Sequence, residues 1–340
     1  MAMKHGGNLL QMAERYQSDV QDWIDLSTGV SPFTYPVGAI PVSAWNQLPQ
    51  AHDGLELAAK YYYQGAIEPV AVAGSQAAIM ALPSLLSDCL GKCDTIALPQ
   101  VGYKEHEHAW RCFRHNHQQW TIIFYDDLPT SEQVAQSDVV LVINTNNPNG
   151  NFYSRERLLS LHAELAAHQG TLIVDEAFVD MTPENSVLTP SKQVENLIVL
   201  RSVGKFFGLA GARVGFVFAE PKLLGLLEEY IGPWGVSGPS RWILKQALSD
   251  SDWQQNNRKR IEQASLRLDN LLSTYLPLKT VGTALFKTVY IEEAIEFHEL
   301  LCQARVLTRL CDEKNAIRFG LPVNEAQWQH LEAALRQLTK

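Results

Sequence analysis

A lysine in a glycine-rich segment is the residue of this sequence best suited to covalent chemistry. The segment covers residues 202–215 and places Lys205 among several glycines. Burial in apolar surroundings disfavours the charged ammonium and lowers the pKa of a lysine, which suits a nucleophile that forms a Schiff base with a carbonyl compound. A lone lysine after a strand is more often a surface residue. The hydroxyl of Ser202 and the guanidinium of Arg213 in the same segment favour the chemical interpretation.

Polar residues also stand directly after three other apolar runs. The residues Gly74, Ser75 and Gln76 open a predicted helix, whose first N–H groups and positive dipole end suit a phosphate, although a Gly-Ser pair here is more often a simple cap. The Asn-Thr-Asn-Asn-Pro-Asn-Gly cluster at 144–150 is explained by a plain turn. Asp175 and Glu176 follow a third run and resemble the magnesium-binding strand of P-loop ATPases, but the chain has no G-x-x-x-x-G-K-[ST] phosphate loop.

These polar segments follow short runs rich in Val, Ile and Phe that alternate with amphipathic stretches. The pattern predicts repeated β-α units in a mostly parallel sheet covered by helices. In such sheets ligands bind outside the carboxyl ends of the strands, so we expect the polar segments to lie near one another. The predicted strands are residues 70–73, 95–98, 120–124, 139–143, 171–174, 197–200 and 214–218.

The pattern of short apolar runs ends after the Gly-Pro-rich stretch at 232–239. Two long amphipathic segments, 240–249 and 252–275, predict helices, and strands near 285–291 and 316–319 then alternate with helices at 292–304 and 325–338. We therefore expect an N-terminal arm (1–45), a large α/β domain (46–239) and a smaller α+β C-terminal domain (240–340). The chain of 340 residues is long enough for two domains.

Composition excludes several classes of protein. Lys and Arg total 28 against 37 Asp and Glu, a net charge of −9, which disfavours a nucleic-acid partner. No signal-peptide pattern or membrane-length apolar run is present, and five scattered cysteines fit reduced thiols, so we expect a cytoplasmic protein. Cys89 and Cys93 share a spacing that a zinc site can use, but no second Cys/His pair accompanies them, so we predict no metal site.

The segment from Ser202 to Gly215 resembles the motif S-x-x-K-x-x-G-x-x-G-x-R-x-G of fold-type I pyridoxal-phosphate enzymes, the class I/II aminotransferase superfamily. The N-P-x-G pattern at 147–150 and the D-x-x-[YF] pattern at 175–178 occur in the expected order. The resemblance covers nearly the whole chain. It implies a large domain with a mostly parallel, seven-stranded sheet, a smaller C-terminal domain, and a homodimer that shares its active sites.

The resemblance also implies a role for each matching residue. Lys205 would form the imine with pyridoxal phosphate, Asp175 would keep the pyridine nitrogen protonated, and Asn147 would bind the ring hydroxyl oxygen. Tyr103 matches the aromatic residue that stacks on the cofactor ring. The residues that would bind the cofactor phosphate are Gly74, Ser75, Gln76, Ser202 and Arg213. Those that would bind substrate are Arg318, for an α-carboxylate, and Arg309 and His5, for a distal phosphate.

Within the family, the N-terminal residues His5-Gly6-Gly7-Asn8 and the Leu-Ser-Thr-Gly-Val-Ser-Pro stretch at 26–32 are similar to the threonine-phosphate decarboxylases of cobalamin biosynthesis. This similarity implies the decarboxylation of L-threonine O-3-phosphate to (R)-1-amino-2-propanol O-2-phosphate. Three positions depart from related sequences: Phe178 replaces a frequent tyrosine, Leu48 stands where aminotransferases often place a tyrosine that reaches the neighbouring subunit, and Gly29 replaces an asparagine.

Two other functions remain open at this point. The shared core also fits an aminotransferase that acts on a phosphorylated compound such as histidinol phosphate, in which the α-hydrogen rather than the carboxylate would leave. A cofactor-free binding protein that kept the fold is the third interpretation, since a fold does not by itself determine a function. The intact Lys205, Asp175, Asn147 and Arg213 argue against it.

Overall fold

The computed structural model describes residues 5–90, 95–114, 119–191 and 194–339. They form two compact units. The small unit comprises the described residues of Met1–Thr34, Pro148–Gly150 and Gln255–Lys340, and the large unit comprises those of Tyr35–Asn147 and Asn151–Gln254. Cys93 lies outside the described residues, so the structure does not bear on a site that contains it.

The large unit is built on a seven-stranded sheet with the order β2-β8-β7-β6-β5-β3-β4. Strand β8 is antiparallel to its neighbours β2 and β7, and all other neighbouring pairs are parallel. The predicted α/β fold is confirmed, because each of the seven apolar runs forms a strand of this sheet. The strands are β2 (Val70–Val72), β3 (Thr95–Pro99), β4 (Thr121–Tyr125), β5 (Val139–Ile143), β6 (Thr171–Asp175), β7 (Leu197–Ser202) and β8 (Gly215–Phe218).

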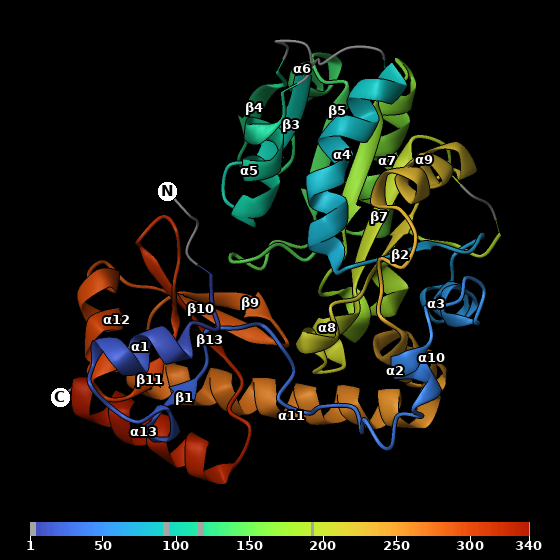
Figure 1. Ribbon diagram of the computed structural model, residues 1–340. Helices are drawn as coiled ribbons and strands as arrows, with labels where there is room; N and C mark the ends of the chain where they lie inside the picture. The colour runs from blue at the N-terminus through green and yellow to red at the C-terminus, as the bar shows by residue number, and fades with distance from the viewer. Residues whose placement is uncertain (1–4, 91–94, 115–118, 192–193, 340) are drawn as a thin grey trace. The chain divides into compact units, whose positions relative to one another are not determined.

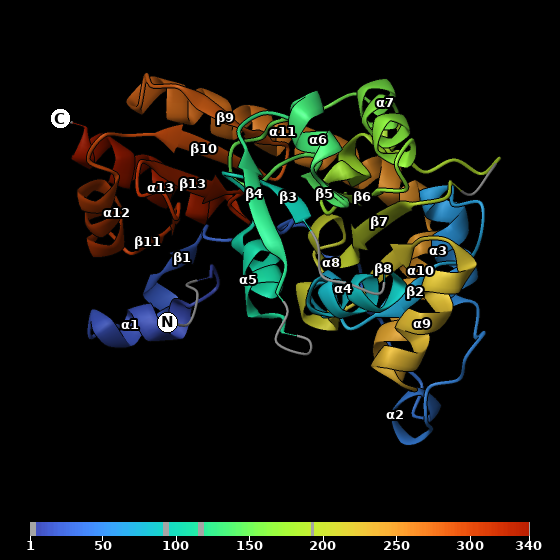
Figure 2. The same ribbon diagram turned by 90° about the horizontal axis from the view of Figure 1, so that it is seen from above.

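Helices cover both faces of this sheet. Figure 2 shows α4, α5 and α9 on one face and α6 and α7 on the other. Strands β5 and β6 are consequently buried at every position, which explains their uninterrupted apolar sequences. The helices of the large unit are α2 (Ser43–Asn46), α3 (Leu55–Tyr63), α4 (Ser75–Leu90), α5 (Lys104–Cys112), α6 (Ser131–Ala135), α7 (Arg155–Ala166), α8 (Val203–Phe206), α9 (Pro221–Ile231) and α10 (Gly238–Ser249). Short 3-10 turns span Val179–Met181, Pro183–Asn185 and Ala210–Ala212.

The small unit contains a four-stranded antiparallel sheet with the order β12-β13-β10-β9. Its strands are β9 (Thr280–Thr283), β10 (Phe286–Tyr290), β12 (Arg309–Leu310) and β13 (Ala316–Gly320), and its helices are α1 (Leu9–Arg15), α12 (Ala294–Gln303) and α13 (Glu325–Leu338). Helix α11 (Ser251–Tyr275) begins in the large unit and continues into the small one (Figure 1). The predicted helices and the strands near 285–291 and 316–319 are present.

The N-terminal residues are part of the small unit. Strand β1 (Ile24–Asp25), which follows a 3-10 turn at Val20–Asp22, pairs in parallel with β11 (Val306–Leu307). The backbone N–H of Gly320 also donates to the carbonyl oxygen of Leu26 at 2.7 Å. The main-chain bonds of β1 therefore go to residues almost 300 positions away, which local periodicity cannot reveal.

None of the helices within the described ranges is both long enough and apolar enough to cross a membrane.

Candidate active site

Two glycines bring the start of α4 against the loop before β8. Strands β2 and β8 pair so that Val72 lies opposite Gly215, and a Cβ on Gly215 would stand 2.5 Å from the backbone nitrogen of Ser75. Gly74 has a φ of +73°, and a Cβ there would stand 2.7 Å from Nη2 of Arg213. The antiparallel pairing thus places a guanidinium beside the first N–H groups of a 16-residue helix. Both are donors that favour an anion.

A buried histidine contacts Asp175. The Nε2 atom of His106 lies 2.9 Å from Oδ2 of Asp175, and the two side chains are only 2% and 5% exposed. The other carboxylate oxygen accepts a hydrogen bond from the N–H of Ala177 at 3.1 Å. These contacts fix the carboxylate at the carboxyl end of β6. No motif of the sequence indicated His106; its spacing of three residues from Tyr103, the residue that caps α5, was the available signal.

Tyr103 lies at the N-terminal end of α5 and contacts Gln76. Its hydroxyl donates to Oε1 of Gln76 at 3.4 Å, and Nε2 of Gln76 donates to the carboxylate of Glu105. The Tyr103 and His106 rings meet edge to face with centroids 6.1 Å apart. The structure therefore joins two predicted cofactor residues, Tyr103 and Gln76, through their side chains. Glu105, which is 8% exposed, is a further member of this cluster, and no motif of the sequence indicated it.

Lys205 lies in the single helical turn α8, which follows β7 without a break. It is half-buried, and its Nζ lies 5.9 Å from the centre of the Phe178 ring. The turn is tightly packed, because a Cβ on Gly204 would stand 2.8 Å from the Cα of Ala210. Ser202 thus ends β7 and Lys205 follows it, whereas Asp175 ends the neighbouring strand β6.

The segment that carries Asn147 follows β5, the next strand of the sheet. The side-chain Nδ2 of Asn144 donates to the carbonyl oxygen of Tyr153 at 3.0 Å, and the backbone N–H of Tyr153 donates to Oδ1 of Asn144 at 2.9 Å. Asn146 donates from Nδ2 to the carbonyl oxygen of Val101 at 2.7 Å. These bonds give the residues before Asn147 a defined path. The structure therefore places the predicted residues Asn147, Asp175 and Lys205 at the carboxyl ends of three adjacent strands.

Arg318 belongs to the small unit and is buried in β13. Its Nη2 donates to the carbonyl oxygen of Ser27 at 2.7 Å, and its Cζ lies 5.1 Å from the centre of the Phe286 ring. Arg318 lies opposite Arg309 in the β12–β13 pair. A buried guanidinium held by a carbonyl oxygen and an aromatic ring has a fixed orientation, which suits the binding of a carboxylate.

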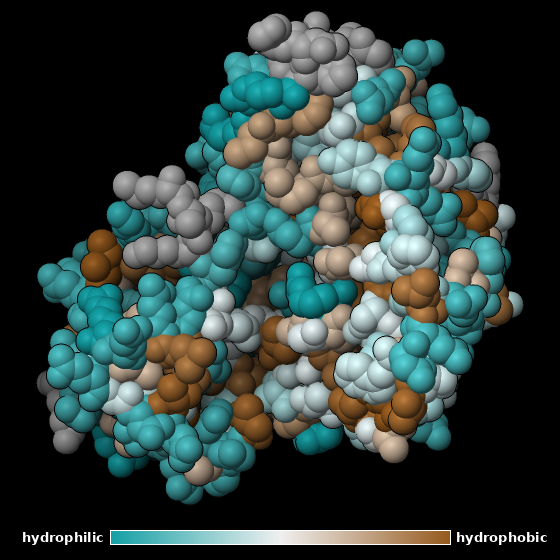
Figure 3. All heavy atoms as spheres, viewed as in Figure 1, coloured by the Kyte–Doolittle hydropathy of each residue, from teal (hydrophilic) through white to brown (hydrophobic). Residues whose placement is uncertain are grey.

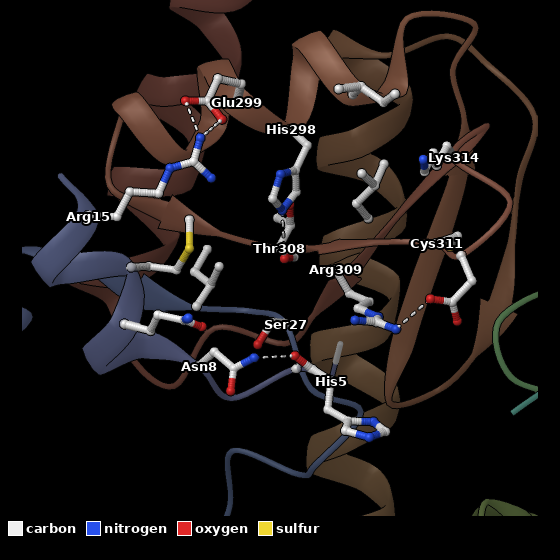
Figure 4. Close-up of a pocket in the computed structure, with 17 residues that line it drawn as sticks. His5, Asn8, Arg15, Ser27, His298, Glu299, Thr308, Arg309, Cys311 and Lys314 are labelled. Carbon is white, nitrogen blue, oxygen red and sulfur yellow. Dashed lines mark hydrogen bonds and ion pairs between the residues drawn. The ribbon is translucent and has the colours of Figure 1, made fainter. Parts of the chain in front are cut away.

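A cavity of about 730 Å³ lies within the small unit. Figure 4 shows Arg309 and His5 along one side of it and Arg15 and Glu299 at the other. An Nη2 atom of Arg309 pairs with Oδ1 of Asp312 at 3.0 Å, whereas Arg15 pairs with Glu299 at 3.1 Å. The structure brings the predicted residues Arg309 and His5 together in this cavity, and Arg318 is not among the described residues that line it.

His298 lines the same cavity. Its Nε2 lies 3.1 Å from the carbonyl oxygen of Thr308. Burial lowers the pKa of His298 below its ordinary value of 6.5, and this effect exceeds the opposing influence of the hydrogen bond to Thr308. The neutral imidazole of His298 is therefore favoured near neutral pH. Arg15, Arg309 and Lys314 place permanent positive charges along the same cavity.

Residues 47–332 match the family described as aminotransferase class I and II, so the chain belongs to this pyridoxal-phosphate-dependent family. It is 41% identical to the threonine-phosphate decarboxylase of Pseudomonas aeruginosa over 98% of this chain and 97% of that protein. A second threonine-phosphate decarboxylase, from Sinorhizobium sp, is 36% identical over 98% of each chain. The crystal structure of histidinol-phosphate aminotransferase from Sinorhizobium meliloti in complex with pyridoxal-5'-phosphate has a TM-score of 0.77 at 18% identity and covers 99% of each chain. This last likeness confirms the fold-type I architecture.

Proposed function

We propose that the protein decarboxylates L-threonine O-3-phosphate to (R)-1-amino-2-propanol O-2-phosphate, a step in the assembly of cobalamin. The observation that carries the proposal is the shared cavity of Arg309 and His5. The full-length similarity to two threonine-phosphate decarboxylases gives that cavity its proposed ligand, the phosphate of the substrate.

The residues at the strand ends fit pyridoxal phosphate. A Cβ on Gly74 or Gly215 would fill the space against Arg213 and Ser75, so the two glycines keep backbone N–H groups and a guanidinium accessible to a phosphate. Asp175, buried and held by His106, is suited to face a protonated ring nitrogen. Lys205 would bond to the cofactor aldehyde, Asn147 would bind its hydroxyl oxygen and Tyr103 would stack on its ring. The proposed phosphate ligands are Gly74, Ser75, Gln76, Ser202 and Arg213.

When bound, the cofactor supplies an electron-withdrawing ring that accepts the electron pair released at the α-carbon of the amino acid. The protein determines which bond releases that pair, because only a bond held perpendicular to the ring breaks readily. Arg318 would hold the α-carboxylate in this orientation, so that CO₂ leaves and a proton takes its place on the α-carbon. Arg309 and His5 would bind the phosphate at the other end of the substrate and contribute binding energy remote from the reacting bond.

The protein is also proposed to act as a homodimer in the cytoplasm. Large apolar side chains of the large unit are exposed between residues 37 and 61, and such patches are typical of protein interfaces. They are Val37, Val42, Trp45, Leu48, Leu57 and Tyr61, of which Trp45 is 67% and Tyr61 71% exposed. Figure 3 shows apolar side chains in brown at the lower right, where Figure 1 draws α2 and α10. A Trp45→Asp variant is expected to sediment as a monomer, and an unchanged dimer would exclude this surface as the interface.

The test of the reaction is mass spectrometry of the products formed from L-threonine O-3-phosphate by the pyridoxal-phosphate-loaded protein, with no 2-oxo acid present. Aminopropanol phosphate and CO₂ are expected, and the Lys205→Ala variant should form neither and should lack the visible absorption band of the bound cofactor. Unchanged substrate would overturn the proposal. The same protein would then be given histidinol phosphate and 2-oxoglutarate, because transfer of the amino group would identify an aminotransferase.

A further inference from the structure

The large unit contains an ion pair that is almost completely enclosed. An Nη1 atom of Arg201 lies 2.6 Å from Oε2 of Glu176, and the two side chains are 2% and 0% exposed. The face of the Tyr63 ring covers the guanidinium, with 4.1 Å between Cζ and the ring centre. Asp180 supplies a second carboxylate at 3.6 Å from Nη2. Burial lowers the pKa of Arg201, but these carboxylates outweigh it and hold the guanidinium in its charged form.

The carboxylate of Glu176 is held from several directions. Its Oε1 accepts a hydrogen bond from the N–H of Val187 at 2.8 Å, and Oε2 accepts another from the hydroxyl of Ser186 at 2.6 Å. Both oxygens therefore have protein partners besides Arg201. These donors fix the position of the Glu176 carboxylate and of the backbone that carries it.

The ion pair joins the two residues that directly flank the proposed cofactor ligands. Glu176 follows Asp175 at the end of β6, and Arg201 precedes Ser202 at the end of β7. The strands are parallel with Asp175 opposite Leu200, and the N–H of Glu176 donates to the carbonyl oxygen of Leu200 at 2.9 Å. Successive residues of a strand point to opposite faces, so the pair connects the strand ends from the side opposite to Asp175 and Ser202.

Stability alone does not explain such a pair. Removing two charges from water costs free energy that their mutual attraction often fails to recover, and apolar side chains of similar volume are frequently as stable or more stable. A buried ion pair does, however, permit only one register of the elements that it joins. Residues 172–174 of β6 and 197–200 of β7 are all apolar, so a charged pair at the carboxyl ends of these strands calls for a reason tied to that place in the sheet.

We propose that the Glu176–Arg201 ion pair is a positioning device that fixes the ends of β6 and β7, and thereby the placement of Asp175 relative to Ser202 and Lys205. The inference rests on the proposed function, because it assigns the pair to the residues proposed to hold pyridoxal phosphate. Neither Glu176 nor Arg201 touches the cofactor in this scheme. We expect loss of the ion pair to alter both the contact of Asp175 with the ring nitrogen and the position of Lys205. Asp175 ends β6 and Lys205 follows the end of β7, so the pair acts on both.

The experiment compares Glu176→Gln, Arg201→Met and the double variant Glu176→Gln/Arg201→Met with the wild type. Three properties are measured: the Kd for pyridoxal phosphate, the pH midpoint of the visible band of the bound cofactor, and the urea midpoint of unfolding. Arg241→Met is the matched control, because Arg241 is a similarly buried arginine of the large unit that pairs with Asp53 and Glu56 at 2.7 Å. Each variant is first checked for the oligomeric state of the wild type by sedimentation.

The double variant separates positioning from stability. Arg201→Met leaves the buried carboxylates of Glu176 and Asp180 without their counter-charge and is expected to lower the urea midpoint most. The double variant removes the nearer of these two charges and recovers part of the loss. If the pair positions the strand ends, the double variant still binds pyridoxal phosphate about 10- to 100-fold more weakly, the range typical for loss of an outer partner of a ligand. Its absorption midpoint also stays shifted, whereas Arg241→Met changes the urea midpoint alone.

Two results would overturn the inference, and they are distinguishable. Recovery of cofactor affinity and of the absorption midpoint in the double variant, in step with its stability, would show that the pair acts only on folding. Failure of the wild-type protein to bind pyridoxal phosphate would instead overturn the proposed function, and this inference with it.

Discussion

The contact between Gly74 and Arg213 makes the proposed phosphate site testable with a single methyl group. In Gly74→Ala the new Cβ would lie 2.7 Å from Nη2 of Arg213, closer than van der Waals contact allows. The guanidinium is the end of a flexible side chain, so it moves while the backbone stays in place. The methyl group therefore displaces the cation proposed to bind the cofactor phosphate and leaves the rest of the sheet intact.

The two consequences of this substitution appear in different measurements. An alanine at a φ of +73° is strained by about 1–2 kcal/mol with or without cofactor, so this cost lowers the free energy of unfolding. A hydrogen bond to a charged group contributes about 1.5–3 kcal/mol, and its loss affects only the bound state. At roughly 1.4 kcal/mol for each factor of ten, the Kd for pyridoxal phosphate should rise by about 10- to 100-fold.

The assay is a titration of the cofactor-free protein with pyridoxal phosphate, followed by its visible absorbance, beside urea unfolding. Gly211→Ala is the control, because Gly211 lies in the same loop as Arg213 and a Cβ there would have no atom within 4 Å. The control should match the wild type in both measurements. If Gly74→Ala binds pyridoxal phosphate as tightly as the wild type, Arg213 does not bind the phosphate from its place beside Gly74 and the reasoning is wrong.

Three further predictions concern other parts of the site. His106→Phe removes the 2.9 Å contact to Asp175 and should lower kcat on the order of tenfold or more, and an unchanged kcat and pH profile would show that Asp175 needs no such support. Asp312→Asn removes the 3.0 Å ion pair of Arg309. Since exposed pairs contribute up to about 1 kcal/mol, KM for the proposed substrate, L-threonine O-3-phosphate, should fall a few-fold, whereas Arg309→Ala should raise it. For His298 the folded pKa lies below 6.5, so the unfolded chain takes up the proton first and stability is lost as the pH falls below that value. His298→Gln should flatten this acidic decline in urea midpoints, and an unchanged decline would assign it to other groups.

The sequence predicted the large sheet well because burial on both faces leaves a clear signal. Strands such as Val139–Ile143 and Thr171–Asp175 are buried at every position, so the cores of their sequences are apolar up to the carboxyl end. The same logic placed Asp175 and Lys205 at strand ends. It could not show that Gly74 and Arg213 meet, because that contact depends on β8 pairing antiparallel to β2, and the order and direction of strands leave no trace in local periodicity.

Short elements held by distant partners were beyond the reach of the sequence. Strand β1 is two residues long and exists only because Ile24 pairs with Val306. The same is true of the cavity in the small unit, where His5 comes from the first residues and Arg309 from the last third of the chain. Motif resemblance assigned both residues to a phosphate, but only their positions in the folded unit show that they line one space.

The two charged residues of the enclosed ion pair, Glu176 and Arg201, stand at strand ends for a common physical reason. A buried strand alternates its side chains between two faces, so a polar residue facing a ligand has a neighbour that faces away from it. Where that neighbour is charged, as Glu176 and Arg201 are, the low dielectric of the interior demands a partner for it. An acid beside Asp175 and an arginine beside Ser202 stand at the ends of two consecutive buried strands and carry opposite charges. Each is therefore the counter-charge of the other. Because side chains alternate along a strand, the two proposed cofactor ligands lie on one face of the sheet and the two charged residues that support them lie on the other, all at the carboxyl ends of β6 and β7.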